Sequence, residues 1–145
     1  MNRLRRFLRY PCRMQLLLAE AFFRLVFVSF LLRLAPSSHF VRRWAGDVSA
    51  VPPRKPQFAG RTSEEICWAV ATAARYLPFA ACLPQSLVAS AMLHRAGHPA
   101  EVRIGVAKDL RGFQAHAWVT AGEKVVLGES AVQFAELPKK KPAGG

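Results

Sequence analysis

The spacing of apolar residues changes once along this chain, near Pro99, and this change constrains the fold more than any other feature. Before Pro99, apolar residues recur at helical intervals, as in the stripe Ile66, Cys67, Val70, Ala73, Ala74 and Leu77. Beyond it, Val102, Ile104 and Val106 alternate with polar or small residues, which is typical of a strand. Helices followed by strands that turn back on each other predict an α+β fold with an antiparallel sheet.

The expected elements follow from this pattern and from local signals. We expect helices over 14–34, over Ser63–Tyr76 and from Cys82 to Gly97, with a short helical piece at 39–44. Thr62 and Glu65 are spaced as a capping box for the second of these helices. Strands are expected over 102–106 and 115–120, and a third strand is expected to begin with 124–127. A polar loop, Lys108–Gly112, joins the first two, and a turn at Gly122 and Glu123 joins the last two.

Charge and proline content divide the chain into unequal parts. The 145 residues carry a formal net charge of +12. Residues 1–61 hold 12 Lys and Arg against Glu20 and Asp47, a surplus of +10. Three prolines between Gly46 and Gly60 indicate a linker. We therefore predict a basic N-terminal arm with an apolar helix and a Pro-rich linker (1–61), a core domain (62–138) and a disordered basic tail (139–145).

The apolar run Leu16–Leu34 follows a cluster of arginines and looks in outline like a targeting signal. Glu20, Arg24 and Arg33 interrupt it, and its longest uncharged piece, Leu25–Leu32, is too short to cross a bilayer of about 30 Å. We expect an apolar helix that docks on the rest of the fold or on a partner. Contact of the arginines with a membrane surface is an open alternative.

The three cysteines are scattered and form no paired framework. This favours a reducing, cytoplasmic location. Cys12 and Cys67 are interpreted as ordinary thiols. Because the sequence shows neither metal-ligand spacing nor a phosphate-binding glycine loop, we expect no metal and no cofactor.

Cys82 and His116 are the residues that indicate chemistry. The positive end of the helix dipole favours a thiolate at Cys82, where a predicted helix begins. An imidazole brought beside it from the later strand would shuttle protons. Each residue alone is more often an ordinary packed side chain. Together, in the papain-like order cysteine, histidine, acid, they predict a cysteine nucleophile that acts on acyl groups.

Hairpin register predicts a third member of the site. If Ala121 pairs with Lys124 across the turn, the ladder places His116 opposite Glu129, with Cβ atoms about 4.5–5.5 Å apart. Glu129 would then orient the imidazole. A different loop length would change this register, so Asp109 and Asp47 are kept as alternatives.

The start of the Cys82 helix also offers hydrogen-bond donors to an oxyanion. The backbone N–H groups of Cys82 and Leu83 are the candidates, because Pro84 has none. Gln85 lies one turn along and is a further candidate through its side-chain amide. Its alternative interpretation is a plain exposed residue.

Four motifs in order carry a resemblance to a known family. They are CLPQSL at 82–87, MLHRAG at 92–97, VRIGV at 102–106 and HAWV at 116–119. This string resembles the transglutaminase-like cysteine leader peptidases of lasso-peptide biosynthesis, the C-terminal half of the B protein. The resemblance implies a transglutaminase-like, papain-like core in which Cys82 is the nucleophile and His116 the base. The family's acid is commonly an Asp about a dozen residues after the His, so Glu129 is a departure.

The resemblance also implies partners. Such a hydrolase cleaves the leader from a ribosomally made precursor peptide and frees the core's N-terminus for a separate ATP-dependent lasso cyclase. The chain resembles the split form, which acts with a separate winged-helix-like leader-recognition protein. One alternative is a transglutaminase-like acyltransferase, which passes the acyl group to an amine. The other is a non-enzymatic basic protein that binds nucleic acid or an anionic membrane. We expect no nucleic-acid partner, since the aromatic–basic interleaving of single-strand binders is missing from the sequence.

Overall fold

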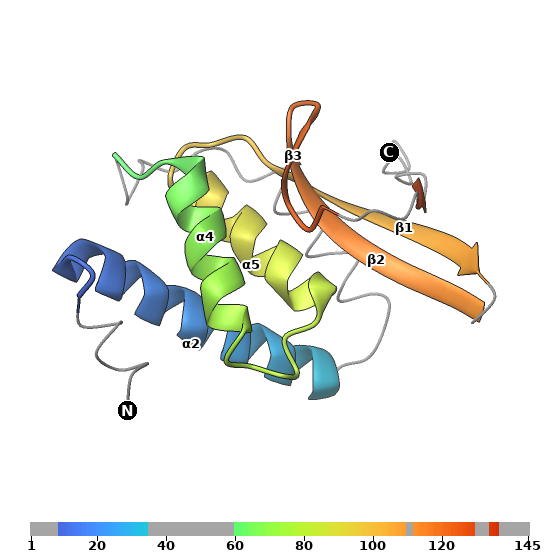
Figure 1. Ribbon diagram of the computed structural model, residues 1–145, viewed down its shortest axis with the longest axis horizontal. Helices are drawn as coiled ribbons and strands as arrows, with labels where there is room; N and C mark the ends of the chain where they lie inside the picture. The colour runs from blue at the N-terminus through green and yellow to red at the C-terminus, as the bar shows by residue number, and fades with distance from the viewer. Residues whose placement is uncertain (1–8, 35–59, 110–111, 130–133, 137–145) are drawn as a thin grey trace, which may run out of the picture.

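The computed structural model describes residues 9–34, 60–109, 112–129 and 134–136. These residues form three helices, α2 (Cys12–Leu34), α4 (Ser63–Ala74) and α5 (Cys82–Arg95). Four strands follow, β1 (Glu101–Asp109), β2 (Gly112–Ala121), β3 (Lys124–Leu127) and β4 (Ala135–Glu136). The predicted order of helices and then an antiparallel sheet is confirmed (Figure 1). The predicted piece at 39–44, the linker and the tail lie outside the described residues.

Helices α4 and α5 begin in different ways. The capping box of α4 is confirmed, because the Thr62 hydroxyl accepts from the Glu65 N–H at 3.2 Å and the Glu65 carboxylate accepts from the Thr62 N–H at 3.0 Å. Helix α5 begins after Ala81, whose side chain has no oxygen to accept a hydrogen bond. Its last turn is followed by Gly97, whose φ of 85° is a left-handed conformation that glycine adopts without strain.

The three helices pack on one another and share one hydrophobic core. Helix α2 contributes Leu17, Ala21, Leu25 and Val28 to that core, all 5% exposed or less. Helices α4 and α5 lie against one side of α2, and α5 also packs against β2 and β1 (Figure 1). The expectation that the N-terminal apolar helix docks on the rest of the fold is therefore confirmed. By length and composition alone α2 would also be able to cross a membrane.

The sheet has the strand order β3-β2-β1-β4, and every described pairing is antiparallel. β1 and β2 pair without interruption from Glu101 opposite Thr120 to Asp109 opposite Gly112. The predicted loop Lys108–Gly112 is therefore too long, because the pairing runs almost to the end of the hairpin. The two-residue strand β4 was not predicted, since a pair of residues carries no periodicity.

The β2–β3 register departs from the predicted one after two pairs. Ala121 pairs with Lys124 and Thr120 with Val125, as predicted, but Val119 then pairs with Leu127 instead of Val126. Val126 is the extra residue of a β-bulge. The bulge lets Val126 and its neighbour Leu127 both pack against the helical core, which strict alternation would forbid. The prediction that His116 faces Glu129 in this ladder is wrong, because the register shifts and β3 ends at Leu127.

Candidate active site

Cys82 is the first residue of α5 and is half-buried. The first N–H of this helix with a backbone partner is that of Gln85, which donates to the Ala81 carbonyl at 3.3 Å. Pro84 has no N–H, and Ala81 provides no side-chain cap. Within the described hydrogen bonds, the N–H groups of Cys82 and Leu83 are therefore left unpaired at the positive end of the helix. This arrangement suits an oxyanion beside the Cys82 sulfur.

Gln85, the predicted side-chain donor, holds the turn that leads into the helix. Its Nε2 donates to the carbonyl oxygen of Ala80 at 2.7 Å. Ala80 is buried at the end of the connection from α4. The Gln85 amide thus stabilises the connection that leads into Cys82. Its role as a hydrogen-bond donor to an oxyanion stays a prediction.

His116 lies in the middle of β2 and is half-buried. Its Nε2 is 2.7 Å from the carbonyl oxygen of Gly128. Because a carbonyl oxygen only accepts, this contact places the imidazole hydrogen on Nε2 and leaves Nδ1 of the neutral ring as the basic nitrogen. The ring also stacks on Phe134 and Trp118, with centroids 5.1 Å and 6.1 Å away.

The backbone conformation and the surroundings of Gly128 both require a glycine at this position. Its φ is +84°, and a Cβ at this position would lie 3.0 Å from the Ala117 carbonyl oxygen and 3.1 Å from the Trp118 Cα. A side chain is therefore excluded both by backbone strain and by the close approach of β2. Gly128 follows His116 by twelve residues.

The structure brings α5 and β2 into contact but does not bond Cys82 to His116. The described residues include no hydrogen bond between the Cys82 sulfur and the imidazole. Side chains alternate between the two faces of a strand, so His116 shares a face with Trp118 and Thr120. Val119, on the other face, is fully buried in the helical core. His116 also lies beyond the last β3 pair, which is Val119 with Leu127.

Of the three candidate acids, Glu129 and Asp109 lie in the described residues. Glu129 is exposed and follows the glycine that bonds His116. Asp109 ends β1 opposite Gly112, whereas the β1 residue opposite His116 is Gly105. Four residue steps separate Asp109 from that level, about 13 Å along the strand. Asp47 lies outside the described residues. In the part of the chain that the structure describes, no group of three or more His, Cys, Asp or Glu residues is arranged to hold a metal ion.

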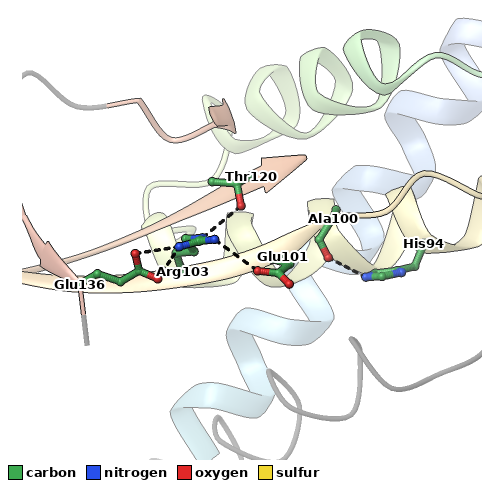
Figure 2. A network of polar contacts seen from close by, with 6 residues as sticks. All are labelled: His94, Ala100, Glu101, Arg103, Thr120 and Glu136. Carbon is green, nitrogen blue, oxygen red and sulfur yellow. Dashed lines mark hydrogen bonds and ion pairs between the residues drawn. The ribbon is translucent and has the colours of Figure 1, made fainter. Parts of the chain in front are cut away.

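The sequence interpretation missed the surroundings of His116. Phe134 and Trp118 cover Gly105, where an added Cβ would lie 2.8 Å from each of them. Phe134 belongs to the segment that forms β4, and an ion pair holds this segment on the sheet. Arg103 Nη1 lies 2.8 Å from both carboxylate oxygens of Glu136 (Figure 2). The one available sequence signal was the glycine in VRIGV, since a glycine inside a strand often marks a close approach.

Arg103 is the centre of this polar network on the sheet. Besides Glu136, it contacts the Thr120 hydroxyl at 3.3 Å and the Glu101 carboxylate at 3.5 Å (Figure 2). His94, interpreted from the sequence as an ordinary residue, bonds the Ala100 carbonyl at 2.7 Å and so secures the connection from α5 to β1.

Comparison with known protein families matches residues 25–138 to the transglutaminase-like superfamily. The match covers most of the chain, so the chain belongs to this family. Members are usually enzymes, either cysteine proteases or acyltransferases, which supports the prediction of cysteine-based acyl chemistry at the level of the class. Comparison with curated proteins and with solved structures gives no match.

Proposed function

We propose that this protein is a cysteine peptidase that removes the leader from a ribosomally made lasso precursor peptide. The observation that carries the proposal is the place of Cys82, a half-buried cysteine at the uncapped start of a helix that packs on the HAWV strand. Membership in the transglutaminase-like superfamily supports the class of chemistry. The motif string from CLPQSL to HAWV supports the narrower substrate.

In the proposed reaction the Cys82 thiolate attacks the carbonyl carbon at the leader–core junction. A C–S bond forms, and the oxyanion is met by the N–H groups of Cys82 and Leu83. The C–N bond then breaks, and the amine of the core leaves with a proton from the His116 imidazolium. Water gives a proton back to His116, attacks the thioester and breaks the C–S bond. The leader leaves with a new carboxylate, and the thiolate is restored.

This reaction requires the imidazole to meet the sulfur when the precursor binds. Catalytic hydrogen bonds are often long or unmade without substrate, so an open pair is compatible with the proposal. Nδ1 is the nitrogen that would take the thiol proton, because Nε2 is engaged with Gly128.

The proposed partners follow from the same resemblance. The precursor's leader would be presented by a separate winged-helix-like recognition protein, and the freed core would pass to an ATP-dependent cyclase. Glu129 stays in the proposal as an auxiliary acid only. Its exposed position indicates that its removal costs less activity than removal of His116.

The test is cleavage of the precursor peptide, with the recognition protein present, followed by mass spectrometry. Cys82→Ala and His116→Ala are expected to abolish release of the leader, and Glu129→Ala to slow it by less. Cys12→Ala is the matched control, since Cys12 is an exposed cysteine at the start of α2 and is expected to leave the rate unchanged. Undiminished cleavage by Cys82→Ala would contradict the mechanism.

The acyltransferase alternative uses the same thioester and differs in the second step. A primary amine such as methylamine, added at high concentration, separates the two. Hydrolysed leader as the main product supports the peptidase, whereas an amide adduct in preference to hydrolysis assigns the transferase. A chain with neither product, but with salt-sensitive binding to nucleic acid that Cys82→Ala leaves intact, is the non-enzymatic alternative.

A further inference from the structure

Helix α2 carries a second apolar face that no described residue covers. Its five large members are Leu16, Phe23, Phe27, Phe30 and Leu34, which are 59–70% exposed. At 100° per residue these positions fall within about 60° of one another around the helix. They form one straight stripe, here called the aromatic stripe, on the side away from Leu17, Ala21, Leu25 and Val28 in the core.

Packing of α2 on the described core does not account for the aromatic stripe. A helix that docks on one side ordinarily has polar residues on the other, and exposed aromatic side chains in a row mark a contact surface. The nearest acid, Glu20, is paired with Arg24 at 2.8 Å and so adds no net charge beside the stripe.

The charges at the ends of the stripe are all positive. In the sequence, Arg9 and Arg13 precede its first member and Arg33 precedes its last. The Arg13 guanidinium also donates to the Gly60 carbonyl oxygen, and that of Arg33 lies 5.8 Å from the centre of the Phe79 ring. Arg3, Arg5 and Arg6 come before them in the sequence, with no acid among residues 1–13. Apolar insertion and basic residues together are the two signals that bind a protein to the surface of an anionic bilayer.

A second copy of the chain fits this surface less well. If two stripes paired in parallel, the Arg9 and Arg13 ends would meet each other, and in the antiparallel arrangement they would meet Arg33. Either way like charges would be opposed at both ends, in a chain of net charge +12. We therefore propose that the aromatic stripe docks this protein on an anionic lipid surface, with the other face of α2 still packed on α4 and α5.

The experiment is co-sedimentation of the full chain with vesicles of phosphatidylcholine containing phosphatidylglycerol, and with vesicles of phosphatidylcholine alone. The triple variant Phe23→Ser, Phe27→Ser, Phe30→Ser is expected to lower partitioning into anionic vesicles at least about tenfold, because it removes three inserted rings. Neutral vesicles are expected to bind the wild type less than anionic ones. The single variant Phe27→Ser should give a smaller loss in the same direction.

Phe113→Ser is the matched control. Phe113 is 80% exposed, but it lies on β2, away from α2, so its loss should leave partitioning unchanged. The inference is overturned if the wild type fails to bind anionic vesicles or if the triple variant binds as well as the wild type. It is also overturned if the stripe variants abolish a dimer, measured by sedimentation velocity, without affecting vesicles. Circular dichroism checks that the triple variant folds. If it does not fold, the vesicle binding of the single variant Phe27→Ser decides the outcome.

Discussion

The His116 imidazole is hydrogen-bonded through Nε2 to the carbonyl oxygen of Gly128 at 2.7 Å. A backbone carbonyl thus stands twelve residues after the histidine, where the resemblance predicted an acid. A carbonyl can orient the ring and select its tautomer, but it offers less stabilisation to an imidazolium than a carboxylate does. In the proposed mechanism, Gly128 is therefore a positioning residue.

Gly128→Ala is expected to lower cleavage by about tenfold, the cost of one lost hydrogen bond of about 1.4 kcal/mol. The added Cβ would meet the Ala117 carbonyl and the Trp118 Cα, so the Gly128 carbonyl has to move away from His116. The nitrogen-15 chemical shifts of His116 provide a direct readout, since they distinguish an Nε2–H from an Nδ1–H tautomer.

Gly122→Ala is the control for this change. Gly122 also has a left-handed φ, +63°, but an added Cβ has no atom within 4 Å. Both variants carry similar backbone strain, while only Gly128→Ala moves the carbonyl. Equal cleavage rates for the two, with an unchanged His116 tautomer, would show that the Gly128 carbonyl has no part in positioning the ring.

The sequence predicted the elements well and the neighbourhood of His116 poorly, for a physical reason. Capping, helix starts and the hairpin turn depend on residues close in the chain, so Thr62 with Glu65 and Ala121 with Lys124 were found. The register beyond Val119 depends on how Val126 packs against helices far away in sequence. The alternation of apolar and polar residues along a strand does not reveal such a bulge. The prediction that Glu129 lies opposite His116 was wrong for this reason.

Removal of the ion pair Arg103–Glu136 is expected to lower the free energy of unfolding only slightly. Its larger effect is expected on cleavage, through the contacts of His116. The pair is about one-third exposed, with side-chain exposures of 33% and 40%, so its coupling energy should be at most about 1 kcal/mol. It nevertheless holds β4, which has only two residues, and with it the Phe134 ring on His116. Glu136→Gln is therefore expected to lower cleavage severalfold.

The matched control is Glu123→Gln, because Glu123 is an exposed acid in the β2–β3 turn. A double-mutant cycle of Arg103→Gln with Glu136→Gln, followed by denaturant unfolding, measures the coupling energy. The role assigned to the pair fails if Glu136→Gln and Glu123→Gln lower cleavage equally.

Thr62→Ala is expected to lower the free energy of unfolding by about 1 kcal/mol, because the Glu65 N–H then loses its side-chain acceptor. Thr62→Ser keeps a hydroxyl and should cost much less. Glu65→Gln should also be mild, since glutamine completes a capping box. Urea denaturation followed by circular dichroism gives the three values, and an unfolding energy for Thr62→Ala equal to that of Thr62→Ser would refute the contribution of the cap.

Ionisation of the Cys67 thiol is expected to lower the free energy of unfolding at alkaline pH. It is 7% exposed in the helical core, and burial raises its pKa from 9.0 to about 11. A raised pKa in the folded state means that the folded protein keeps the thiol proton longer than the unfolded chain does. The stabilisation is therefore complete below pH 9 and is lost as the pH rises through 11. At roughly 1.4 kcal/mol per pKa unit, the loss is about 2 to 3 kcal/mol.

Urea denaturation of the wild type and of Cys67→Ala between pH 8 and 11.5 isolates this contribution, because other groups that titrate in this range are common to both proteins. The wild type should lose more stability than the variant over that interval. Alkylation with iodoacetamide gives a second readout, in which exposed Cys12 reacts before buried Cys67. Parallel stability curves for the two proteins, or early labelling of Cys67, would show that this thiol does not stay buried in the core.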